Sequence, residues 1–170
     1  MQYHFIIENL ESYDFIKKKY TSKNICFWTT NEEIIQKLSS TEKISHLEKF
    51  AKQQDINNIG KACYLFQEKI CNEINKKFKF DKNINYGEIF SNSIYRNFFI
   101  LNYKCFLIKN LLKKFHNKNI KLFCVGNAEI KNNKILDINF DRFDNIFSIL
   151  SKHINDLNIE NLHYQIDKKK

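Results

Sequence analysis

The fold class is decided by the stretch NICFWTTNEEIIQKL, residues 24–38. Its first part, residues 25–28, is an unbroken run of strand-forming residues, which is typical of a strand covered on both faces. Thr30 then has the position of a helix N-cap, and Glu33 three residues later completes a capping box. The stretch therefore predicts a strand, a tight polar turn and a helix, which together are the half-unit of a parallel α/β fold.

The same order of strand, turn and helix recurs along the chain. Further strands are predicted at residues 3–7, 43–47 and 122–125, and helices at residues 10–20, 55–78 and 89–115. A short extended piece at residues 135–138 and a last helix that begins at Asp141 or Asp144 are also predicted. Parallel strands that alternate with helices form layered α/β domains.

The domain organisation follows from this pattern. Residues 1–157 are expected to form one Rossmann-like domain, a three-layer α/β sandwich with a mainly parallel sheet. A large helical insertion, roughly residues 55–115, is expected between the third and fourth strands. Residues 158–170 are expected to form a tail or to lead into a further segment, because they end in three lysines and show no clear periodicity.

Composition excludes several classes of function. The net charge of +9 comes almost wholly from lysine, and the chain is rich in Asn, Ile, Phe and Tyr, so codon bias explains the charge better than a nucleic-acid partner does. The five cysteines are odd in number and have no metal-ligand spacing, which favours reduced thiols, a cytoplasmic protein and no bound metal. The sequence contains neither a glycine-rich phosphate loop nor a nucleophile elbow, so a standard dehydrogenase, NTPase or α/β-hydrolase is not indicated.

Small polar residues follow three of the predicted strands. They are Asn9, Thr29, Thr30, Gly126 and Asn127. If the strands are parallel neighbours, these residues converge on one edge of the sheet, where ligands of α/β proteins bind. The alternative is that they only cap helices and shape turns. Thr29 is the residue for which the sequence indicates no structural role.

Two further residues are candidates for binding or chemistry. Arg142 lies among Asp137, Asp141 and Asp144, which is typical of an ion-paired helix start, although the arginine could also bind a phosphate or carboxylate. His46 lies near the end of a predicted strand and is the best placed of five scattered histidines. A surface or core-rim role is nevertheless the commoner one for such a histidine.

Most of the chain resembles the amino-terminal Rossmann-like half of GT-B glycosyltransferases of bacterial surface-polysaccharide pathways. The resemblance lies in the order of the predicted elements and in the general character of five segments. They are HFIIENLESYDFIKKKY, ICFWTTNEEIIQKL, YRNFFILNYKCFLIKNLLKK, IKLFCVGN and DRFDNIFSIL. It implies that Asn9, Thr29, Thr30, Gly126 and Asn127 line an acceptor cleft that Arg142 approaches. Glu8 and Glu32, each beside a strand end, are the candidates for the catalytic base that many inverting members carry in this half.

The resemblance also implies a set of partners. A glycan is the expected acceptor, no cofactor is expected within this chain, and a nucleotide sugar would be held by a second, carboxyl-terminal domain. Peripheral contact with the inner face of the membrane is expected, and specific nucleic-acid binding is not. Two alternatives stay open, namely a non-catalytic interaction domain of the same fold, which predicts an apolar surface patch, and a basic nucleic-acid-binding protein, which predicts a basic face.

Overall fold

The computed structural model describes residues 1–21, 24–78, 83–115, 120–127, 129–131, 134–137, 147, 150 and 159–164. The chain is an α/β protein that divides into two compact units. The sheet unit comprises Met1–Phe50 and Leu107–Lys170, and the hairpin unit comprises Ala51–Phe106. No linker in the sequence indicates this division, because one long helix contains residues on both sides of the boundary.

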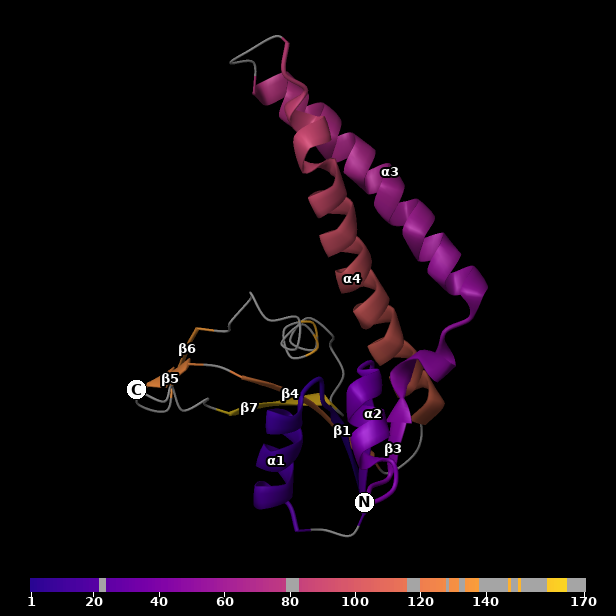
Figure 1. Ribbon diagram of the computed structural model, residues 1–170, viewed down its shortest axis with the longest axis vertical. Helices are drawn as coiled ribbons and strands as arrows, with labels where there is room; N and C mark the ends of the chain where they lie inside the picture. Colours follow the sequence, from indigo (N-terminus) through magenta and orange to yellow (C-terminus); the bar gives the residue numbers. More distant parts are fainter. Residues whose placement is uncertain are drawn as a thin grey trace. The chain divides into compact units, whose positions relative to one another are not determined.

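A five-stranded, all-parallel sheet forms the centre of the sheet unit (Figure 1). Its strands are β1 (Gln2–Ile6), β2 (Ile25–Thr29), β3 (Ile44–His46), β4 (Ile120–Asn127) and β7 (Ile159–Tyr164). The strand order is β3-β2-β1-β4-β7. Strands β2 and β3 therefore lie on one side of β1, and β4 and β7 lie on the other, as in a dinucleotide-binding fold. The four strands predicted from the sequence are confirmed to within two residues at each end.

Strand β7 is a correction to the sequence analysis. Residues 159–164 lie in the segment that was expected to form a tail, but they pair in parallel with β4, from Leu122 opposite Ile159 to Asn127 opposite Tyr164. The predicted extended piece at residues 135–138 corresponds to β6 (Lys134–Asp137), which pairs with β5 (Glu129–Lys131) in a separate antiparallel ladder. Most of the predicted last helix lies outside the described residues.

Aromatic side chains fill the core between the sheet and helix α1 (Leu10–Lys19). Phe5 is fully buried, stacks on Phe123 with ring centroids 4.9 Å apart, and meets Tyr20 edge-on at 5.0 Å. Because side chains alternate along a strand, His4 and Trp28 lie on the opposite face, where both rings contact Phe115. Side chains from helical segments therefore contact both faces of the central strands.

A polar network fixes the segment before β3. The Tyr13 hydroxyl donates to Glu42 Oε1 at 2.8 Å, and Lys17 Nζ donates to the same oxygen at 2.7 Å. Burial, together with the hydrogen bond to the Glu42 carboxylate, raises the pKa of Tyr13 to about 12. The short strand β3 is thereby tied to α1 as well as to β2.

Two long helices make up the hairpin unit, with α4 continuing beyond it. Helices α3 (Gln53–Lys77) and α4 (Tyr86–Phe115) run side by side in opposite directions (Figure 1). Phe66 packs on Phe98 with ring centroids 4.2 Å apart, and Asn102 Nδ2 lies 3.7 Å from Cys63 Sγ. The predicted helices at residues 55–78 and 89–115 are confirmed, with α4 beginning three residues earlier than expected.

Candidate functional site at the carboxyl edge of the sheet

Two candidate residues from neighbouring strands meet at the carboxyl edge of the sheet. Glu8 follows β1 by two residues, and Thr30 comes directly after β2. The Thr30 hydroxyl donates to Glu8 Oε2 at 2.8 Å, and the Thr30 backbone N–H donates to Glu8 Oε1 at 3.3 Å. Both carboxylate oxygens are thus oriented by one residue. A carboxylate can accept about four hydrogen bonds, and hydroxyl groups are among the donors that it binds.

The predicted cap at Thr30 is wrong, because helix α2 (Glu32–Leu38) has Asn31 as its N-cap. Asn31 Oδ1 accepts from the Glu33 backbone N–H at 3.0 Å, and its amide nitrogen donates to the Glu8 carbonyl at 3.2 Å. Both Thr and Asn can cap a helix. Tertiary structure decides between them, since the Thr30 hydroxyl is directed to Glu8 instead.

Thr29 has a structural role that the sequence did not indicate. Its side chain is fully buried, and its hydroxyl oxygen accepts from the Asn31 backbone N–H at 3.0 Å. The hydroxyl therefore shapes the turn that carries Thr30 and Asn31 toward Glu8. The expectation that Thr29 has no structural duty is corrected.

We expect Thr29→Val to lower the free energy of unfolding by about 1 kcal/mol, the usual value of one intramolecular hydrogen bond. Urea unfolding followed by the fluorescence of Trp28, the chain's single tryptophan, measures this change. Thr21→Val is the matched control, because Thr21 is exposed and a surface substitution is expected to change stability by less than about 0.5 kcal/mol. Equal midpoints for the two variants would contradict the prediction.

Asn9 joins the start of α1 to the last strand of the sheet. Its side-chain oxygen caps α1 by accepting from the Ser12 backbone N–H at 2.7 Å, and it also accepts from the Tyr164 hydroxyl at 3.0 Å. Tyr164 is the final residue of β7 and is buried. It was missed in the sequence because the segment around it has no apolar run.

A histidine and two glutamates meet at the end of β3. His46 Nε2 lies 3.8 Å from Glu32 Oε2, and His46 Nδ1 accepts from the Glu48 backbone N–H at 3.2 Å. Glu32, the second candidate base, is thus beside the histidine that the sequence placed near a strand end. The Glu48 carboxylate is also close, with Oε2 3.7 Å from His46 Nδ1.

The remaining candidates are placed only in part. Gly126 and Asn127 do not follow β4 but form its last two residues, paired with His163 and Tyr164 of β7. Arg142 lies outside the described residues. The carboxyl ends of β1 and β4 are neighbours, and the sheet order reverses between them, which is the position where parallel α/β proteins bind ligands.

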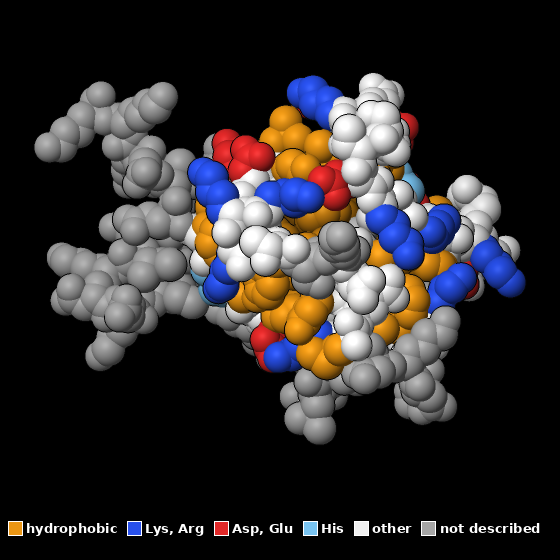
Figure 2. All heavy atoms as spheres, turned by 90° about the horizontal axis from the view of Figure 1, so that it is seen from below, with side chains coloured by type: hydrophobic (Ala, Val, Ile, Leu, Met, Phe, Trp, Pro, Cys, Tyr) orange, Lys and Arg blue, Asp and Glu red, His pale blue; other side chains and the backbone are white. Residues whose placement is uncertain are grey.

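The segments that follow β1, β2 and β3 are rich in glutamate although the chain is basic, and Glu33 among them is paired with Lys37. Within five residues after β1, β2 and β3 the chain has one lysine, Lys49, and five glutamates, Glu8, Glu11, Glu32, Glu33 and Glu48. On the face drawn in Figure 2, Lys and Arg side chains lie scattered among hydrophobic, acidic and uncharged ones. Because like charges repel, this edge favours a neutral, hydroxyl-rich ligand over a phosphate.

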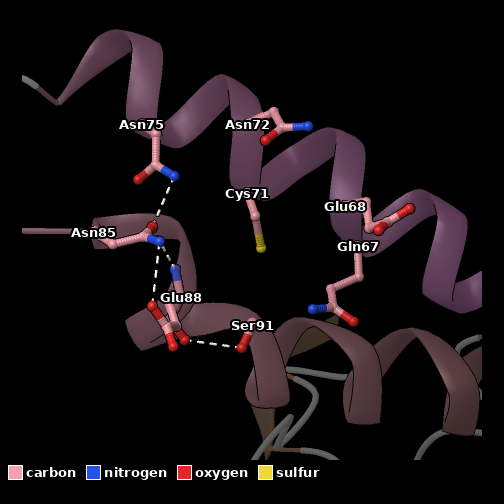
Figure 3. A pocket seen from close by; sticks show the side chains of 8 residues that line it. All are labelled: Gln67, Glu68, Cys71, Asn72, Asn75, Asn85, Glu88 and Ser91. Carbon is pink, nitrogen blue, oxygen red and sulfur yellow. Dashed lines mark hydrogen bonds between the residues drawn. The ribbon is translucent and has the colours of Figure 1, made fainter.

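The hairpin unit has a cavity of its own, about 280 Å³ in volume, between α3 and α4 (Figure 3). It is lined by Gln67, Glu68, Cys71, Asn72, Asn75, Asn85, Glu88 and Ser91. Asn75 Nδ2 donates to Asn85 Oδ1 at 2.7 Å, and Asn85 Nδ2 donates to Glu88 Oε2 at 3.2 Å. These polar groups bind one another and so stabilise the hairpin turn.

The chain is thus a parallel α/β protein with glutamates at the carboxyl ends of three of its five sheet strands. No protein family, curated protein or solved structure matches it. Among the described residues, no cluster of His, Cys, Asp and Glu could hold a metal ion. Within the same part of the chain, the helices are too short or too polar to span a membrane.

Proposed function

We propose that this chain is the acceptor-side domain of a glycosyltransferase, a Rossmann-like three-layer domain that binds a glycan at the carboxyl edge of β1 and β2. The observation that carries the proposal is the Glu8 carboxylate, which Thr30 orients at the ends of two neighbouring parallel strands. Sugar hydroxyls are donors that match such an acceptor. The acidic surroundings also favour a neutral glycan over an anionic ligand.

In this proposal Glu8 is the general base. It takes the proton of an acceptor hydroxyl while the hydroxyl oxygen forms a bond to the anomeric carbon of the donor sugar. The bond from that carbon to the diphosphate breaks, and the nucleoside diphosphate leaves with the electron pair. Glu32, beside His46, is the second candidate for this role. The resemblance to GT-B enzymes assigns the donor to a second domain, and the reaction to the cytoplasmic face of the membrane.

Titration of the isotope-labelled chain with methyl glycosides, followed by amide NMR, tests this proposal. We expect methyl glucoside, methyl galactoside or methyl mannoside to shift the amide signals of Glu8, Thr30 and Asn31. Glu8→Gln should weaken binding about tenfold, since a hydrogen bond to a charged group is lost. Glu11→Gln removes the same charge from an exposed neighbour and should leave binding unchanged. If none of the glycosides shifts these amides, or both variants weaken binding equally, the proposal is wrong.

A second candidate, a protein-interaction domain, is favoured by a different observation. Apart from Met1, the large hydrophobic side chains that are exposed among the described residues all belong to the hairpin unit. They are Tyr64, Leu65, Phe66, Phe78, Ile84, Ile89, Phe90 and Leu101. The concentration of exposed apolar side chains in this unit, and not in the sheet unit, is what favours a protein partner.

A further inference from the structure

Helix α4 covers one side of α3, and two large apolar side chains of α3, Tyr64 and Leu65, are exposed. On the covered side, Cys63 lies against Asn102, and Gly60 lies against Tyr95 and Phe99. The residues of that side recur at intervals of three and four and are buried or half-buried; they are Ile56, Gly60, Cys63, Gln67, Ile70 and Ile74. At 100° per residue, Leu65 lies on the far side of the helix from these residues, whereas Tyr64 lies about 40° from Gly60, at the edge of the covered side; they are 60% and 53% exposed.

The exposed side of α3 carries a self-complementary pattern. Asn57, Lys61, Glu68 and Asn72 are all exposed and lie on the same stripe of the helix as Tyr64 and Leu65, and Glu68 and Asn72 also line the cavity between α3 and α4. The pattern is symmetric about the midpoint between Tyr64 and Leu65. Going outward from that point, an apolar residue, then a charged one, then an asparagine follows in each direction, and the two charges have opposite sign.

We propose that this stripe, Asn57 to Asn72 on the exposed side of α3, is the interface of a homodimer in which α3 packs antiparallel against α3 of a second copy. A two-fold axis between Tyr64 and Leu65 places Tyr64 opposite Leu65 of the other copy. It also places Lys61 opposite Glu68, and Asn57 opposite Asn72. The inference rests on the hairpin unit alone and does not depend on the proposed glycan site.

A second copy is the occupant that this pattern fits best. An isologous interface requires one surface to complement itself. The two-fold axis meets this requirement here, because it places Lys61 of each copy opposite Glu68 of the other. Binding of a helix from a different protein would not require the residues of α3 to be arranged symmetrically about a midpoint. Stable protein interfaces bury about 1,200–2,000 Å² in total, more than two helical stripes of this length supply, so the dimer should dissociate on dilution.

Sedimentation equilibrium of the full chain over a range of concentrations tests the proposal. The unmodified chain should associate to a dimer as concentration rises. Leu65→Ser should weaken association at least tenfold, whereas Ile89→Ser, which changes a 63% exposed residue on α4, should leave it unchanged. Both side chains are exposed, so neither variant should alter the thermal unfolding of the chain.

Charge reversal tests the register of the two helices. Lys61→Glu and Glu68→Lys should each weaken self-association roughly tenfold, since both symmetry-related pairs change from attraction to repulsion. An equimolar mixture of these two variants should form heterodimers as tightly as the unmodified chain, because every facing pair is again opposite in sign. A monomeric unmodified chain, equal effects of Leu65→Ser and Ile89→Ser, or a mixture that stays monomeric overturns the proposal.

Discussion

Replacing Phe5 by alanine is expected to lower the free energy of unfolding of the sheet unit by about 3–5 kcal/mol, the usual cost of truncating a buried phenylalanine. Phe5 is fully buried in β1 and contacts the rings of Tyr20, Phe27 and Phe123. β1 pairs with both β2 and β4, so the cavity opens where three strands meet. Because the interior is close-packed, neighbouring rings can fill this cavity only in part.

Urea unfolding followed by Trp28 fluorescence measures the effect of Phe5→Ala, because Trp28 lies in β2 and is buried. Phe90→Ala is the matched control, since it makes the same substitution at a side chain that is 50% exposed on α4. The control should change the free energy of unfolding by less than about 0.5 kcal/mol. A change of similar size in both variants would mean that the Phe5 ring does not support the core.

Gly87→Ala is expected to destabilise the contact between α3 and α4 by about 2 kcal/mol, within the usual range for overpacking. A Cβ atom at Gly87 would lie 2.5 Å from the Cys71 carbonyl oxygen and 2.9 Å from Asn75 Nδ2. The carbonyl belongs to the backbone of α3, so the helices must separate to admit the methyl group. Separation would also lengthen the hydrogen bond from Gly87 N to Asn75 Oδ1, now 2.7 Å.

Gly60→Ala is the control for this substitution, because it makes the same change in the middle of α3. Its Cβ would lie 3.3 Å from the Tyr95 hydroxyl, the far end of a side chain that can move aside. Alanine is favoured over glycine in a helix interior by about 1 kcal/mol, so this variant should be slightly more stable. Hydrogen exchange of the α3 and α4 amides measures both changes. Equal protection in the two variants would contradict the close approach at Gly87.

The sequence by itself determined the class of fold and most of its elements. Residues 25–28 and 122–125 are continuous apolar runs, and apolar residues recur at helical spacing in α3. These patterns are local, so they can be recognised in the sequence without knowledge of the rest of the structure. The same signals placed Glu8 and Thr30 at strand ends and thus near one edge. Whether this edge binds a glycan stays a prediction.

Tertiary structure alone decided which of these residues touch. The sequence did not predict β7, because its segment, IENLHY, has too few apolar residues. The segment is a strand because its backbone groups pair with those of β4. Thr30 and Asn31 are both good caps, and the choice between them depends on Glu8, 22 residues away. Tyr164 reaches Asn9 across 155 residues of chain. Local patterns predict elements because the periodicity is set by the backbone, whereas hydrogen bonds between distant residues follow from the packing of the whole domain.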